Sequence, residues 1–207
     1  TITMTNYLQI MYKKISIKII MILVTAAIVT VPSSMLQLSH AQPNQDMQEV
    51  LNIHNRERAE VNFPVLTWSD SLAADAQKWA NHLTTLGIVC GSGGCKPTTP
   101  HGATNENIAS GYVYPAELGR TSPAEYTQMW ADEKVAYNGG QRSGLGIGHY
   151  AAMVWKATTQ VGCWFAPGAV PDQEGRGGGT DFLVCRYNPG KGGASEAPLN
   201  LPNYNVK

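Results

Sequence analysis

The sequence predicts an α+β fold, because stretches with helical periodicity are interleaved with short strand-like runs. Apolar residues recur at helical spacing over residues 47–61 and 72–83, whereas residues 159–166 and 181–187 are rich in the β-branched and aromatic residues of strands. The chain has 207 residues and 43% hydrophobic residues, enough for the core of one ordinary domain. We expect that domain to span residues 46–190.

A segment typical of a signal peptide precedes the predicted domain. Lys13, Lys14 and Lys18 come before an apolar run from Ile19 to Val31, and Ser39-His40-Ala41 offers a small-x-small cleavage pattern. A membrane anchor is the alternative, but the run is shorter than the roughly 20 residues that a span needs. We therefore expect residues 1–41 to be removed and the protein to be secreted, with no transmembrane span in its mature form.

Net charge and cysteine content indicate which partners and which cellular compartment to expect. Three of the 15 Lys and Arg lie before Ala41, which leaves 12 against 15 Asp and Glu and a net charge near −3. A mildly acidic chain without a basic cluster argues against nucleic acid as a partner. All four cysteines follow the signal segment, and an even number in an oxidising compartment predicts disulfides.

Two helices are predicted in the first half of the domain. The first is ended by Asn62-Phe63-Pro64, and the second begins after one of the N-cap candidates Ser69-Asp70-Ser71. Their apolar stripes are Met47, Val50, Leu51, His54, Arg58 and Val61, and then Leu72, Ala76, Trp79, Ala80 and Leu83.

The third helix has the clearest start. Ser122, Pro123 and Glu125 form a capping box with proline in the first turn, and this helix should run to about Tyr137. The other expected elements are a loop over Gly87–Thr104, an extended piece over Asn107–Tyr112, a short helix over His149–Lys156, and strands over Thr159–Ala166 and Asp181–Tyr187. Residues 191–207 lack apolar periodicity and are expected to form a flexible tail.

Four segments, in order, resemble the CAP superfamily, which comprises the cysteine-rich secretory, antigen 5 and pathogenesis-related 1 proteins. Each matches one of the family's motifs over nearly the whole domain. The segments are Leu51-x-x-His54-Asn55-x-x-Arg58 with the following Pro64-x-Leu66-x-Trp68; His101-x-x-x-x-Glu106-Asn107-Ile108-Ala109; Trp130-x-x-Glu133; and Gly148-His149-Tyr150 with Val161-Gly162-Cys163 and Cys185-x-Tyr187-Asn188-Pro189.

The resemblance implies a three-layer α-β-α sandwich with a mixed or antiparallel central sheet. It also implies a cleft that holds His101, Glu106, Glu133 and His149, with His101 and His149 as the metal ligands. Family members are mostly non-catalytic extracellular proteins that require no cofactor. Several bind lipids or sterols, and some bind zinc or another divalent cation at the histidine pair.

Departures from the family pattern suggest a divergent branch. Ala151 stands where the family usually has Thr, Val or Ser, and Pro189-Gly190-Lys191-Gly192 replaces its Pro-x-Gly-Asn end. We expect the disulfides Cys163–Cys185 and Cys90–Cys95. The first pair lies within the two strand candidates and matches how related family cysteines pair, whereas Cys90 and Cys95 have no clear family counterpart.

The residues themselves support some of these roles and leave others open. Glu133 lies on the aromatic side of its helix, where a carboxylate needs a hydrogen-bond partner or a nearby cation; it could also merely border the core. A histidine pair with a carboxylate could form a zinc site, but the compact H-E-x-x-H signature is absent. His54 lies on an apolar stripe and is expected to be a hydrogen-bonded core residue, and Asn55 and Arg58 to be packing and capping partners.

The function favoured by the sequence is a secreted, non-enzymatic CAP-domain protein with a His/Glu cleft that binds a divalent metal and a lipid or sterol-like molecule. The alternative is a metal-dependent hydrolase in which Glu106 or Glu133 is the general base. A third hypothesis is that the protein is an extracellular interaction module with a vestigial cleft. No G-x-S-x-G elbow is present, and the Gly144-x-Gly146-x-Gly148 run follows no convincing strand, which argues against a serine hydrolase and a dinucleotide site.

Overall fold

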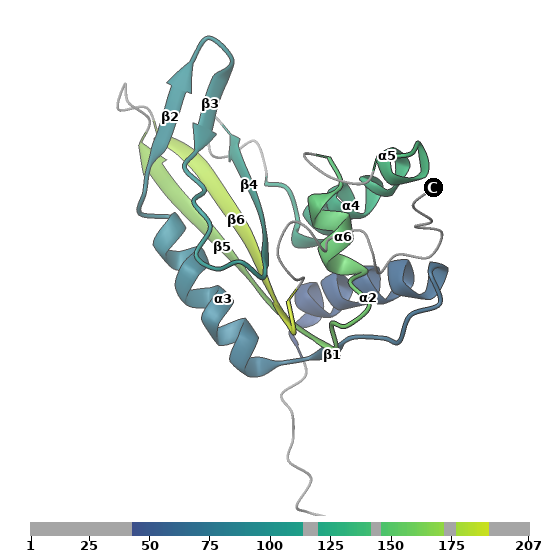
Figure 1. Cartoon of the computed structure of the whole chain (residues 1–207). Helices are drawn as coiled ribbons and strands as arrows, with labels where there is room; N and C mark the ends of the chain where they lie inside the picture. Colours follow the sequence, from purple (N-terminus) through teal and green to yellow (C-terminus); the bar gives the residue numbers. More distant parts are fainter. Residues whose placement is uncertain (1–42, 114–119, 142–145, 172–176, 191–207) are drawn as a thin grey trace, which may run out of the picture. The chain divides into compact units, whose positions relative to one another are not determined.

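A mixed four-stranded sheet in the order β1-β5-β6-β4 lies between helices (Figure 1). The computed structural model describes residues 43–113, 120–141, 146–171 and 177–190, all within the unit His40–Lys207. The elements are α2 (Gln45–Glu60), β1 (Thr67–Trp68), α3 (Asp70–Leu83), β2 (Ile88–Gly91), β3 (Gly94–Pro97), β4 (Glu106–Val113), α4 (Pro123–Asp132), α5 (Lys134–Asn138), α6 (Gly148–Met153), β5 (Gln160–Pro171) and β6 (Gly177–Asn188).

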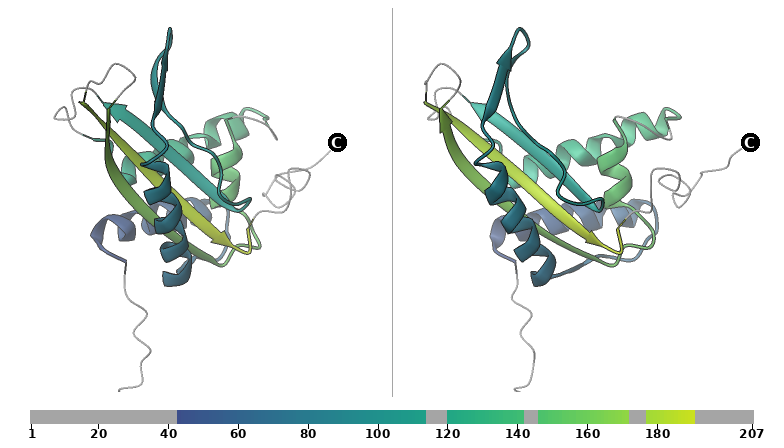
Figure 2. Two further views of the ribbon diagram at one scale, coloured as in Figure 1. Left: turned by 90° about the vertical axis from the view of Figure 1, so that its left-hand side faces the viewer. Right: turned by 60° about the vertical axis from the view of Figure 1, so that its left-hand side comes forward.

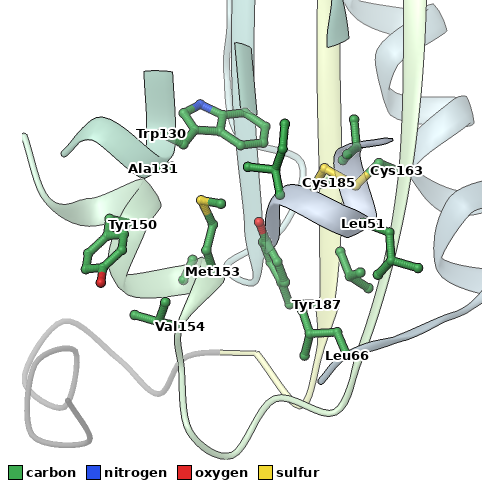
Figure 3. Close-up of a cluster of buried hydrophobic side chains, with 14 of the residues drawn as sticks. Leu51, Leu66, Trp130, Ala131, Tyr150, Met153, Val154, Cys163, Cys185 and Tyr187 are labelled. Atoms are coloured by element: carbon green, nitrogen blue, oxygen red, sulfur yellow. A yellow bond between two sulfur atoms is a disulfide. The ribbon is translucent and has the colours of Figure 1, made fainter. Parts of the chain in front are cut away.

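Alternation along β6 gives the sheet two apolar faces. Phe182 and Val184 pack with Ala76, Ala80 and Leu83 of α3. Leu183, Cys185 and Tyr187 point the other way, into a larger core formed with α2, α4 and α6. Figure 2 shows helices on both sides of the sheet, and Figure 3 shows Cys185 and Tyr187 among the side chains of this core. Because successive side chains of a strand point to opposite faces, one strand supplies both cores. The predicted three-layer α-β-α sandwich is confirmed.

The central pairing is longer than the sequence predicts. β5 and β6 are antiparallel neighbours from Gln160↔Asn188 to Pro171↔Gly177, so pairing continues through glycines and prolines that strand propensity disfavours. β4 pairs antiparallel with β6, and the two-residue β1, which the sequence analysis missed, pairs parallel with β5.

The predicted start signals of the second and third helices are confirmed. Ser69, one of the three N-cap candidates, caps α3, and Ser122 forms the expected capping box with Glu125. Asn44, which the sequence analysis did not single out, caps α2. The third helix is interrupted at Glu133, where α4 gives way to α5.

Buried Arg58 joins α2 to the segment before β5. Its guanidinium donates hydrogen bonds to the carbonyls of Pro64, Met153, Trp155 and Thr158 at 2.6–3.3 Å. Burial lowers the pKa of Arg58 to about 10. The last predicted helix ends at Met153, not Lys156, and the carbonyls of Met153 and Trp155 are used by Arg58.

Both expected disulfides are present. Cys163 faces Cys185 across β5 and β6 inside the larger core (Figure 3), and Cys90 is bonded to Cys95. The second bond joins the strands of a β2–β3 hairpin within Gly87–Thr104, a stretch that the sequence predicts as a loop. Ile88 and Val89 favour a strand, but the glycines and prolines that follow them made the whole stretch look like a loop.

Residues 1–41 and 191–207, predicted as signal peptide and tail, lie outside the described residues. No helix in the described part of the chain has the length and apolar character needed to cross a membrane.

Candidate functional site: two histidine–glutamate pairs

The first pair joins a loop histidine to the first residue of β4. Oε1 of Glu106 lies 3.0 Å from Nδ1 of His101 and accepts the backbone N–H groups of Gly102 at 2.5 Å and Ala103 at 3.1 Å. The Glu106 side chain is fully buried, whereas the His101 side chain is 63% exposed. The carboxylate therefore holds the turn that carries His101 and leaves the far side of the ring accessible.

Arg186 balances the buried charge of Glu106. The two residues are register partners on β6 and β4, and Nη1 of Arg186 lies 3.0 Å from Oε2 of Glu106. Nε of Arg186 lies 3.4 Å from Oδ2 of Asp75 on α3. These are ion-pair distances without good hydrogen-bond angles, since the three buried atoms of Glu106 and Arg186 have no hydrogen-bond partner among the described residues. An arginine in this position makes an anionic Glu106 tolerable in the interior.

The second pair joins the α4–α5 junction to α6. Oε1 of Glu133 lies 2.7 Å from Nδ1 of His149, and Oε2 accepts the backbone N–H groups of His149 at 2.9 Å and Tyr150 at 3.0 Å. α6 has no side-chain cap of its own, so Glu133 supplies its first turn with the missing acceptor. Glu133 both orients the His149 ring and fixes the start of the helix that carries it.

The environment of Glu133 keeps it ionised. Burial raises its pKa, but the hydrogen bonds from the His149 ring and the Tyr150 N–H outweigh burial, so the pKa is lowered from its ordinary value. An ionised carboxylate only accepts hydrogen bonds, which makes Nδ1 of His149 the donor. Nε2 of His149 is therefore the ring atom left for a ligand.

Trp130 and Asn107 hold His149 from other elements, and the sequence analysis gave neither a site role. The rings of Trp130 and His149 stack at 5.7 Å with an interplanar angle of 14°. Nδ2 of Asn107 donates to the His149 carbonyl at 3.1 Å and to the Tyr187 hydroxyl at 3.0 Å. Signals for both existed, because Trp130 precedes Glu133 by three residues on a helix and Asn107 follows Glu106.

The start of β4 links the two pairs. Glu106 and Asn107 are consecutive on this strand, so their side chains point to opposite faces. Glu106 meets Arg186, which reaches α3, while Asn107 reaches His149 on α6. The described residues contain no group of three or more His, Cys, Asp or Glu side chains placed to hold a metal ion. Each histidine is joined to its own glutamate, and the convergence of all four in one cleft stays a prediction.

His54 has the core role predicted for it. It is fully buried, with Nδ1 at 2.8 Å from the Val50 carbonyl and Nε2 at 2.9 Å from the Tyr187 hydroxyl. Burial lowers the pKa of His54 to about 4, so the ring is neutral near pH 7. Asn55 likewise holds Leu66 through both its backbone groups.

Comparison with known proteins agrees with the fold and the motifs. The family model described as "CAP: Cysteine-rich secretory protein family" matches residues 51–187. Pathogenesis-related protein 1A of Nicotiana tabacum is 31% identical over 168 residues, covering 79% of this chain and 87% of that protein. Venom allergen 5 of Vespa magnifica is 35% identical over 126 residues, covering 60% of this chain and 50% of that protein.

Among solved structures, that of Hookworm Platelet Inhibitor is similar in fold. Its TM-score is 0.51 at 18% identity, and the match covers 77% of this chain and 78% of that one. Motifs, fold and relatives lead to one assignment: the chain belongs to the cysteine-rich secretory protein family, CAP.

Proposed function

We propose that the chain is a secreted, non-enzymatic CAP protein that presents Nε2 of His101 and of His149 to a divalent cation such as zinc. The observation that carries the proposal is that a glutamate contacts Nδ1 of each histidine. A carboxylate behind the ring fixes the tautomer and raises the basicity of the other nitrogen, the arrangement found behind metal-ligating histidines.

The donor set fits a weakly held ion. The two imidazoles are 63% and 38% exposed, and both glutamates are occupied by other donors. The protein would therefore supply two nitrogen ligands, and water the remaining ones. A bound cation would polarise an oxygen of water or of a ligand.

The engagement of both glutamates argues against the hydrolase alternative. A general base needs an oxygen free to take a proton from water. Oε1 of Glu106 has three donors and its Oε2 is paired with Arg186, while Glu133 accepts three hydrogen bonds. Taking up a proton at either residue would break the contacts that hold the histidines.

Two parts of the proposal rest on the family. The family is described as secretory and the domain carries two disulfides, which supports export. A lipid or sterol-like molecule as ligand is supported by family resemblance alone.

Zinc titration by calorimetry tests the metal site. The wild type should bind zinc, and His101→Ala and His149→Ala should each weaken binding at least about tenfold, since each removes one of two protein ligands. His82→Ala is the matched control, because His82 is an exposed histidine on α3 whose ring lies 5.0 Å from the Trp79 ring at a tilt of 41°. Acidification should also weaken binding, because protons compete for Nε2.

Equal zinc affinity in the wild type and the His101→Ala/His149→Ala double variant would refute the metal site. Hydrolysis of an ester or peptide that requires metal and disappears in Glu106→Gln or Glu133→Gln would restore the enzyme alternative.

A further inference from the structure

We infer that Cys90–Cys95 is a thiol-exchange site, which extracellular thiols reduce while the domain stays folded. The two disulfides of the domain differ in their access to solvent. Cys163 and Cys185 are fully buried in the larger core. Cys90 and Cys95 are half-buried, belong to neither core cluster, and sit between exposed Val89 and the exposed hairpin tip at Gly91–Gly94.

The β2–β3 hairpin forms a sheet separate from the main one. Figures 1 and 2 show it extending beyond the end of β4, and within the described part of the chain its strands pair only with each other, from Ile88↔Pro97 to Gly91↔Gly94. Its base is closed by the Thr98 N–H and the Gly87 carbonyl at 3.2 Å. Ile88 at the base of the hairpin is the only buried side chain of β2 and β3, so little apolar burial depends on this disulfide.

The charge of the hairpin also favours attack by a thiolate on the Cys90–Cys95 disulfide. Thiol exchange proceeds through a thiolate anion, and its rate depends on access to the attacked sulfur. Lys96 is the only charged residue in Ile88–Pro97, so the hairpin does not repel an anion.

The reaction needs only a dithiol as reductant. One of its thiolates bonds to Sγ of Cys90 or Cys95, and the electron pair of the broken S–S bond leaves on the other cysteine sulfur. The second thiolate of the reductant then attacks the reductant sulfur of this mixed disulfide and releases the attacked cysteine as a thiolate. Two electrons thereby reach the protein, and the reductant becomes a cyclic disulfide.

Reduction should leave the candidate site in place. The Pro100 carbonyl accepts from Nε1 of Trp79 at 3.1 Å, and Glu106 holds the next turn through Gly102 and Ala103. The hairpin can therefore loosen without releasing His101.

The test is timed reduction of the folded protein with dithiothreitol, followed by alkylation and peptide mass spectrometry. Cys90 and Cys95 should be modified at least about 100-fold faster than Cys163 and Cys185, because the core pair becomes accessible only on unfolding. Far-UV circular dichroism and tryptophan fluorescence should stay native when only the hairpin is modified. The Cys90→Ser/Cys95→Ser variant should keep the same spectra and show no fast alkylation.

Simultaneous modification of all four cysteines, or none before denaturant is added, would overturn the inference. A parallel reaction with glutathione, a monothiol, should give a mixed disulfide on the hairpin peptide alone, and its appearance on a core peptide would also count against the site.

Discussion

Replacing Glu133 by alanine removes three hydrogen bonds that join α4, α5 and α6. Two of them satisfy the N–H groups of His149 and Tyr150 in the first turn of α6, and the third orients the His149 ring. If Glu133 is an anchor for the histidine, its loss should destabilise the domain as well as weaken metal binding.

The magnitude follows from these contacts. Loss of a helix-capping side chain costs about 1–2 kcal/mol, and loss of a hydrogen bond with a charged partner costs a similar amount. The Glu133 side chain is 16% exposed, so water replaces part of what is lost. We expect a decrease of about 2–3 kcal/mol, or about 5–10 °C in Tm for a domain of this size.

Thermal unfolding followed by circular dichroism measures the effect, with Asp132→Ala as the matched control. Asp132 is the preceding residue on the same helix, but it is exposed, and its carboxylate accepts a hydrogen bond from Gln128 of the same helix. Its loss should cost less than about 0.5 kcal/mol. Equal Tm values for Glu133→Ala and Asp132→Ala would refute the anchoring role.

The dependence on pH gives a second check. Because the folded pKa of Glu133 is lowered, its contribution is complete above its ordinary pKa of 4.5 and is lost as the pH falls through the folded value. The Tm difference between wild type and Glu133→Ala should therefore shrink in acid. A difference that stays constant down to the lowest pH at which the wild type folds would show that the charge of Glu133 contributes nothing.

Two further predictions concern the core. His54 has a folded pKa of about 4, so the unfolded chain binds a proton at a higher pH than the folded chain does, and the free energy of unfolding should fall by about 3 kcal/mol as the pH drops from 6.5 to 4. Chemical denaturation of His54→Gln should show a weaker dependence of this free energy on pH. A dependence equal to that of the wild type would contradict the buried, neutral state of His54. Gly162→Ala should cost at least about 2 kcal/mol in the same assay, because the added methyl would overlap the backbone of Ser69 and Ala73. Gly93→Ala is its control, since no atom lies within 4 Å of the added methyl at that position, and equal stability of the two variants would refute the overlap.

Much of the secondary structure could be predicted from local patterns. The capping box at Ser122 and Glu125 and the stripe of buried residues on α2 are determined over a few consecutive residues, so the sequence displays them directly. The β2–β3 hairpin could not be predicted in this way, because the glycines and prolines of this stretch indicate a loop, whereas backbone pairing and the Cys90–Cys95 disulfide hold its two short strands together.

The candidate site was likewise predictable in part. Family motifs alone single out the four polar side chains, since His101, Glu106, Glu133 and His149 each lie in one. Their pairing comes from the folded chain. Two histidine–glutamate pairs form, Arg186 lies beside Glu106, and Asn107 donates to the His149 carbonyl. These contacts join residues up to 80 positions apart, Glu106 and Arg186 among them, and depend on sheet register and helix packing. Local periodicity carries no information about either.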